Sequence, residues 1–139
     1  MSQNPAVRTM DQHRAEFALE QIQLITKKAP AFQAEVRRYI PALPALIHMN
    51  GLGQAMAFYL SKSKGDPEKE TAYSVIYCIL GIWLCDKKSK GRVFDQDADL
   101  LKAITKSDMQ HYMAAQNEAQ ALLEWLKKFA VALLKQDEN

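Results

Sequence analysis

The chain has 139 residues, 48% of them hydrophobic, which is enough apolar material for a packed core and excludes the intrinsically disordered class. Its 18 Lys and Arg residues against 16 Asp and Glu residues give a net charge of +2, too small to indicate nucleic-acid binding unless the cations cluster locally. We expect a single all-helical domain over residues 1–139, with residues 1–9 as a flexible N-terminal arm. No signal peptide or bilayer-length apolar run is evident, so we expect a cytoplasmic protein.

Apolar residues at spacings of three and four predict helices along almost the whole chain. The expected helices cover residues 10–28, 30–49, 52–62, 67–87, 97–105 and 108–135. The predicted fold class is therefore all-α, a compact bundle of about five to six helices. The fourth helix is apolar on nearly every side, which places it at the centre. Trp83 and Trp125 are expected to be largely buried, with exposure at a subunit interface as the alternative for Trp125.

Capping residues predict where three of these helices begin. Asp66 followed by Pro67 is a good start for the fourth helix. Ser107 followed by Gln110 matches a capping box at the start of the last helix. The start of the fifth helix is expected to be supported, through the helix dipole, by three carboxylates: Asp95, Asp97 and Asp99.

The segment from residue 40 to residue 60 is the most informative part of the chain, because it places prolines and glycines inside a strongly helical sequence. Pro41 and Pro44 remove backbone donors and are expected to bend the second helix. Gly51 follows Asn50, a pair that readily adopts the left-handed geometry that ends a helix. Gly53 lets the next helix start close by, so we predict a tight corner with a positive φ, most favourably at Gly51.

No catalytic or metal-binding constellation emerges from the sequence. His13, His48 and His111 form no Glu-x-x-His pair of the kind that di-iron bundles require. Cys78 and Cys85 lie about two helical turns, or ~10 Å, apart on one face, beyond disulfide reach, and they indicate buried thiols. We therefore predict a protein that is not an enzyme and that needs no metal and no cofactor.

Lysines and arginines come in close sets near the predicted helix ends, and two interpretations of them stay open. The sets are Lys27–Lys28, Arg37–Arg38, Lys62–Lys64, Lys87–Lys88–Lys90–Arg92 and Lys127–Lys128. Each set can simply be solvated and offset the dipole at a helix C-terminus. Alternatively, several sets converge into a stripe that binds phosphates by charge and shape rather than by base identity.

Three blocks of sequence together resemble a known family. They are Arg14-Ala-Glu-Phe-Ala18; Leu43-Pro-Ala-Leu-Ile47 with Asn50-Gly-Leu-Gly-Gln54 and Ala57-Phe58; and Tyr112 with Asn117-Glu-Ala119 and Leu122-Leu-Glu-Trp-Leu-Lys-Lys-Phe-Ala130. In this order they resemble the small all-helical subunit, the fifth Cmr protein, of the type III-B (Cmr) CRISPR RNA-silencing complex. Residues 63–106 carry little of this resemblance.

The resemblance implies a non-catalytic subunit of an antiviral ribonucleoprotein. Its implied partners are other Cmr subunits, further copies of itself, and guide and target RNA through the phosphate backbone, with no membrane and no small-molecule substrate. Because guide pairing reads the sequence, such RNA contacts go to phosphates and sugars. The basic residues in or beside the matching blocks are the RNA-backbone candidates: Lys27, Lys28, Arg37, Arg38, Lys62, Lys64, Lys127 and Lys128.

Two other functions compete with this one. A helical adaptor that binds only protein needs no converging basic stripe. A small helical enzyme is the third possibility, and bound metal in the purified protein would favour it.

Overall fold

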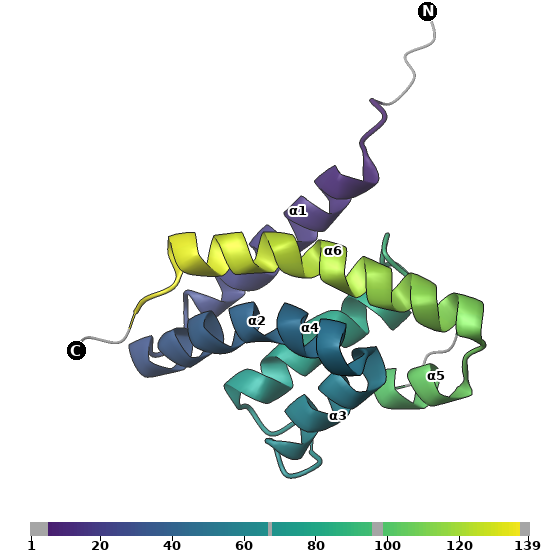
Figure 1. The fold of residues 1–139 in the computed structure, drawn as a ribbon. Helices are drawn as coiled ribbons and strands as arrows, with labels where there is room; N and C mark the ends of the chain where they lie inside the picture. Colours follow the sequence, from purple (N-terminus) through teal and green to yellow (C-terminus); the bar gives the residue numbers. More distant parts are fainter. Residues whose placement is uncertain (1–5, 67, 96–98, 137–139) are drawn as a thin grey trace, which may run out of the picture.

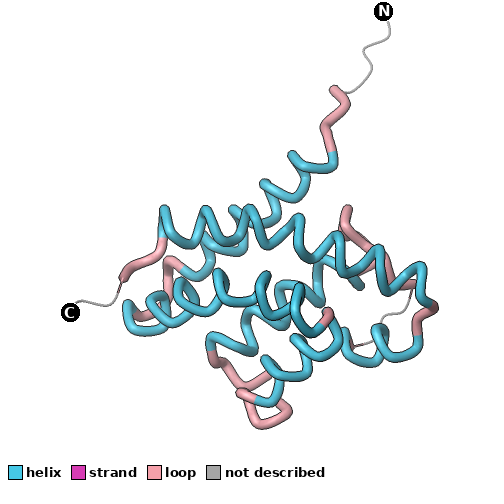
Figure 2. Tube along the Cα trace, in the orientation of Figure 1, coloured by secondary structure: helices cyan, strands magenta, loops and turns pink. Residues whose placement is uncertain are grey.

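The computed structural model describes residues 6–66, 68–95 and 99–136. These residues contain helices and loops but no strand (Figure 2), so the predicted all-α fold is confirmed. The helices, labelled in Figure 1, are α1 Met10–Ile25, α2 Pro30–Asn50, α3 Leu52–Ser61, α4 Ala72–Cys85, α5 Leu100–Lys106 and α6 Met109–Leu133. None of the described helices is both long and apolar enough to cross a membrane.

Helices α2 and α6 form a long antiparallel pair, side by side in Figure 1. Near one end, the Lys135 amide donates to Gln33 Oε1 over 3.1 Å. Near the middle, Gln120 Nε2 donates to the Pro44 carbonyl oxygen over 2.9 Å. Helix α1 crosses α6 and packs against it, so α6 contacts helices from both halves of the chain.

Helix α4 lies at the centre of the bundle, as predicted. It packs against α2, α3, α5 and α6. Ile76, Leu80 and Leu84 are fully excluded from solvent. Each such side chain contributes about 1.5–3 kcal/mol through burial. The apolar character of this helix on nearly every side therefore follows from its position among the other helices.

Helix α2 stays continuous through Pro41 and Pro44, although neither residue has an amide to donate. Side chains of neighbouring helices bond to the backbone carbonyls of this stretch. Tyr59 Oη donates to the Tyr39 carbonyl over 2.6 Å, and Gln120 donates to the Pro44 carbonyl. These tertiary bonds attach the proline-containing stretch of α2 to α3 and α6.

The fourth helix begins later than predicted, at Ala72 rather than Pro67, which lies outside the described residues. Thr71 Oγ1 accepts from the Ser74 amide over 3.0 Å, and Ser74 Oγ accepts from the Thr71 amide over 2.9 Å. This reciprocal cap satisfies two amides at the start of the helix. Asp66 instead accepts from the Glu68 amide in the preceding turn.

The predicted cap of the last helix was also wrong by one residue. Asp108, not Ser107, is the N-cap of α6, and its carboxylate accepts from the His111 amide over 2.8 Å. Ser107 Oγ donates back to the Ile104 carbonyl and ends α5. The fifth helix begins at Leu100 and is capped by Asp99, whereas Asp97 lies outside the described residues.

Candidate nucleic-acid interface

The corner between α2 and α3 is held against α6 by hydrogen bonds to its backbone. Gly51 has φ of +87°, which confirms the predicted left-handed residue. The Leu52 amide donates to Gln116 Oε1 over 2.9 Å, and the Gly53 amide donates to Tyr112 Oη over 3.0 Å. These bonds satisfy amides that the start of α3 leaves without helical partners. The corner therefore fixes α3 relative to α6, a role the sequence did not assign to Gln116.

Arg37 lies on the seam between α2 and α6. Its Nη2 donates to the Val131 carbonyl over 3.4 Å, and its Nε is buried without a hydrogen-bond partner. Lys127 lies one helical turn before Val131, so it projects from the same flank of α6. Arg38 follows Arg37, and an open hollow of about 240 Å³ beside them is lined by Ala34, Arg37, Arg38 and Gln136. We call Arg37, Arg38 and Lys127 the α2/α6 seam cluster.

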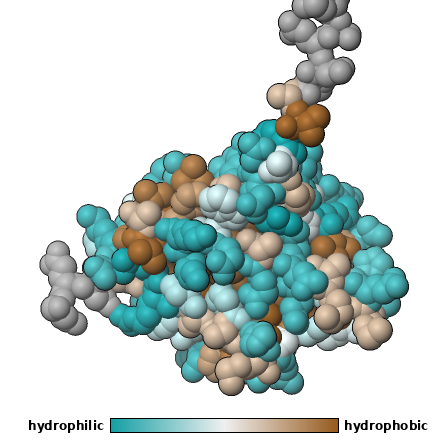
Figure 3. Space-filling model, turned by 45° about the horizontal axis from the view of Figure 1, so that its top comes forward, coloured by the Kyte–Doolittle hydropathy of each residue, from teal (hydrophilic) through white to brown (hydrophobic). Residues whose placement is uncertain are grey.

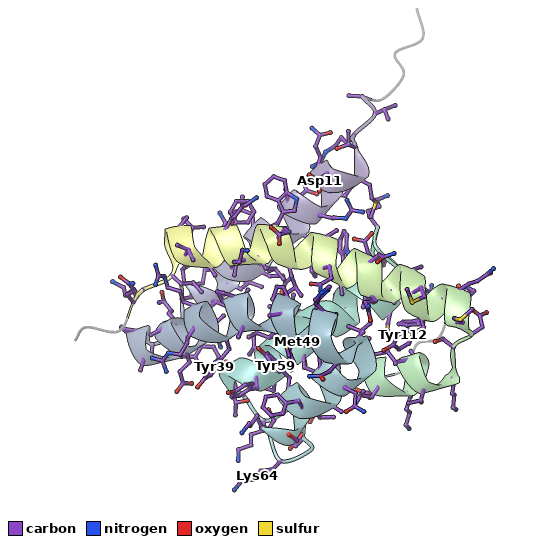
Figure 4. All side chains as sticks on the ribbon, viewed as in Figure 1. Asp11, Tyr39, Met49, Tyr59, Lys64 and Tyr112 are labelled. Atoms are coloured by element: carbon purple, nitrogen blue, oxygen red, sulfur yellow. The ribbon has the colours of Figure 1, made fainter. Side chains whose placement is uncertain are left out.

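The other five candidates lie elsewhere on the molecule. Lys128 Nζ lies 6.0 Å from the centroid of the Trp125 ring, on the flank of α6 that faces α1. Lys27 and Lys28 follow α1, where Lys28 Nζ pairs with Glu70 Oε1 over 2.6 Å. Lys62 and Lys64 follow α3, and Lys64 lies at the tip of its loop, far from α6 (Figure 4).

A charged network that the sequence did not reveal joins α1, α4 and α6. Arg14 Nε and Nη2 donate to the two carboxylate oxygens of Glu118 over 2.6 and 2.9 Å. Trp83 Nε1 donates to the same carboxylate over 3.0 Å. The hydrogen bond to Glu118 raises the pKa of Arg14. The pair is mostly buried, so its geometry orients the helices relative to one another.

Trp83 is buried as predicted, and Trp125 is partly buried, packed against the edge of the core. Trp125 Nε1 donates to Asp11 Oδ1 over 2.9 Å, and this bond is the main cause of a lowered pKa for Asp11. The Trp125 ring lies 5.7 Å from the Phe129 ring. Helix α1 covers part of this face of α6 and leaves the rest in solvent.

Titratable side chains of the described residues do not assemble into a reactive centre. No three His, Cys, Asp or Glu residues among them gather as a metal-binding set. Cys85 is buried, and burial raises the pKa of its thiol to about 11. Cys78 is half-buried, and desolvation raises its thiol pKa as well. At neutral pH both residues are therefore thiols rather than nucleophilic thiolates.

Comparison with known proteins identifies the family. A family model described as CRISPR-associated protein (Cas_Cmr5) matches residues 10–133, from the start of α1 to the end of α6. The fold is similar to the crystal structure of a CRISPR-associated Cmr5 family protein from Thermus thermophilus. That match has a TM-score of 0.70 and 26% identity, and it covers 92% of this chain and 100% of the other. The chain belongs to the Cmr5 family of CRISPR-associated proteins.

Proposed function

We propose that this chain is the non-catalytic small subunit of a type III-B Cmr ribonucleoprotein that stacks along the paired guide and target RNA. In this role it contacts neighbouring Cmr subunits, further copies of itself and the RNA backbone. Membership of the Cmr5 family makes it a Cmr complex subunit and supports the rest of the proposal.

The observation that carries the RNA contact is the α2/α6 seam cluster. Arg37 and Arg38 line an open hollow, and Arg37 reaches the Val131 carbonyl of α6, one helical turn beyond Lys127, which lies about 90 residues away in the sequence. Cations placed this way contact phosphates, which every RNA sequence presents alike. A subunit that must accept any guide needs this kind of contact.

Affinity purification of the native complex through this subunit tests the assembly. We expect other Cmr proteins together with short guide RNAs that share a 5′ segment. Recovery of protein partners with no guide RNA would contradict the ribonucleoprotein role.

Salt-dependent filter binding by the assembled complex tests the RNA contact. Charge-neutralising pairs, such as Arg37→Ala with Arg38→Ala or Lys127→Ala with Lys128→Ala, should weaken RNA binding without changing sequence preference. Each lost phosphate contact lowers the slope of log affinity against log salt by about one. Lys88→Ala with Lys90→Ala, in the segment without family resemblance, is the matched control.

The second candidate function is a helical adaptor that binds protein and not RNA. Figure 3 shows apolar patches on one face of the otherwise hydrophilic surface. Met49 and Met109 are each 78% exposed, and exposed methionines suit protein contacts. If complexes that carry each of these double mutants assemble normally and keep the wild-type salt slope, the adaptor function is better supported than the RNA-binding function.

Absence of catalysis is tested separately. Pure protein incubated with labelled RNA and Mg²⁺ or Mn²⁺ should leave the RNA intact. Cleavage that copurifies with the chain and depends on one of its side chains would refute a non-catalytic role.

A further inference from the structure

Four aromatic side chains from three helices form a continuous row, which we call the aromatic ladder. Tyr39 of α2 stacks on Tyr73 of α4, with ring centroids 4.2 Å apart. Tyr73 meets Tyr59 of α3 edge-on at 5.0 Å. Tyr59 in turn lies 6.1 Å from Phe58. Tyr39 and Tyr59 lie next to each other in Figure 4, on the side of α2 away from α6.

A cation lies over each end of the aromatic ladder. Lys62 Nζ is 5.1 Å from the centroid of the Phe58 ring. At the other end, Arg38 Cζ is 6.0 Å from the centroid of the Tyr39 ring. Lys64 lies two residues beyond Lys62 at the exposed tip of the loop. The row of rings therefore has positive charge at both ends, and each charged group is carried on a long, flexible side chain.

Burial is graded along the ladder in a way that leaves aromatic surface accessible. Phe58 is 45% exposed, and Tyr39 and Tyr73 are half-buried. Tyr59 is buried, and its hydroxyl is anchored to the Tyr39 carbonyl, so it holds the outer rings in place. Both phenols are neutral at neutral pH, and desolvation raises the pKa of Tyr73 and of Tyr59 further above the ordinary value.

We infer that the aromatic ladder is a stacking platform for unpaired nucleotides of RNA, an inference that rests on the proposed function. A base stacks on the accessible ring of Phe58, and Lys62 moves from the ring to the adjoining phosphate. Arg38 contacts a phosphate at the far end of the ladder. Glu35, which also acts electrostatically on Tyr73, opposes the charge of Arg38 and limits the affinity.

Charge and geometry both favour an unpaired strand as the occupant. Every base has a π-face, so stacking on aromatic rings is independent of sequence, as a guide-directed complex requires. Bases inside a duplex are already stacked on both sides and cannot reach a ring, so paired RNA does not use this site. The cations at both ends complement phosphates, which a purely apolar protein surface does not offer.

Equilibrium binding of fluorescent RNA to the full chain at low salt tests the platform. The probes are an unstructured strand of about 12 nucleotides and the blunt-ended duplex of that strand with its complement. Phe58→Leu should weaken binding of the unpaired strand by about fivefold to a hundredfold, since it keeps apolar bulk and removes the stacking ring. Phe58→Trp should restore binding, and neither change should alter binding of the duplex.

Two further variants separate stacking from charge and from general damage. Lys62→Ala should lower the salt slope by about one for the unpaired strand. Ile82→Ala is the matched control, because Ile82 is also 45% exposed but lies on the opposite face of α4 from Tyr73. It should leave binding unchanged.

Several results would overturn the inference. It is wrong if Phe58→Leu binds the unpaired strand as tightly as the wild type, if wild type shows no preference for that strand, or if it does not bind it. If Phe58→Leu loses other Cmr subunits but keeps its RNA affinity, the ladder is a protein interface. Any of these can occur while the native complex still copurifies with guide RNA, so failure here is distinguishable from failure of the proposed function.

Discussion

The Tyr112 hydroxyl accepts a hydrogen bond from the Gly53 amide over 3.0 Å, and the same oxygen would lie 2.9 Å from a Cβ added to Gly51. The Tyr112 side chain of α6 thus accepts a hydrogen bond from an amide at the start of α3. It also occupies the space that a larger residue at Gly51 would need. Two independent requirements, positive φ and close approach, fall on the same glycine.

Alanine at Gly51 should be destabilising by about 2–4 kcal/mol, because it adds a steric conflict to left-handed strain. Gly65 has φ of +77° with no atom within 4 Å of an added Cβ. The loss of stability in Gly65→Ala, about 1 kcal/mol, therefore measures the backbone strain without a steric conflict. Gly51→Val should be destabilising by at least as much as alanine at this position, because its two methyl groups extend beyond the Cβ that already meets Tyr112. Urea unfolding measures all three. Equal losses at Gly51 and Gly65 would show that contact with Tyr112 has no effect.

Gly91 should tolerate substitution poorly for a purely steric reason. An added Cβ would lie 2.0 Å from Cε2 of the Trp83 ring, which is buried and held by its bond to Glu118. We expect Gly91→Ala to destabilise the fold by about 2–4 kcal/mol. The double variant Gly91→Ala with Trp83→Phe should lose less stability than the sum of the losses in the two single variants. Strict additivity in thermal or urea unfolding would contradict the contact.

The two tryptophans should behave differently in solution. Trp83→Ala should cost about 3–5 kcal/mol, as expected for a buried ring. Trp125→Ala should cost less, about 1–2 kcal/mol, because its ring is only partly buried. Iodide should quench the fluorescence of Trp125 in a Trp83→Phe variant, and Trp83 should resist quenching in a Trp125→Phe variant. Equal quenching of both would refute this arrangement.

Asp11 links the packing of α1 on α6 to pH. The bond from Trp125 lowers the pKa of Asp11 below its ordinary value of 3.8, so the folded state binds a proton less readily than the unfolded state. This contribution to stability is present above pH 3.8 and is lost as the pH falls through the lowered pKa. Trp125 emission in a Trp83→Phe background should shift in that acid range. In Asp11→Asn the shift in emission should disappear. If the shift persisted, Asp11 would be excluded as its cause.

Local patterns in the sequence predicted the elements that depend on local forces. The spacing of apolar residues by three and four located every described helix. The central helix could be identified because residues 72–85 are apolar on nearly every side. Gly51 could be assigned a positive φ because Asn-Gly at a helix end leaves few alternatives. Helix starts were less predictable. Asp66 before Pro67 is the more conspicuous signal for the start of the fourth helix. The helix instead begins after Thr71, where Thr71 and Ser74 each accept from the other's amide.

The features missed by sequence reasoning depend on contacts between distant segments. Arg14 and Glu118 are 104 residues apart, and nothing in either local pattern specifies the partner. The bond from Trp125 to Asp11 depends on how α1 crosses α6, which helical periodicity does not set. The aromatic ladder likewise requires three helices to converge. Its only sequence signal is a set of aromatic residues near Arg38 and Lys62, which indicates nothing until the helices are placed.

The proline-containing stretch of α2 has a consequence for how the protein is made. Without amides at Pro41 and Pro44, this helix lacks two of its own hydrogen bonds, so its stability depends more on packing against its neighbours. Tyr59 is synthesised shortly after α2, but Gln120 is 76 residues away from Pro44. During translation, α2 and α3 can associate early, whereas the face of α2 that pairs with α6 stays uncovered until α6 leaves the ribosome. Chaperones that shield exposed apolar helices would act in this interval.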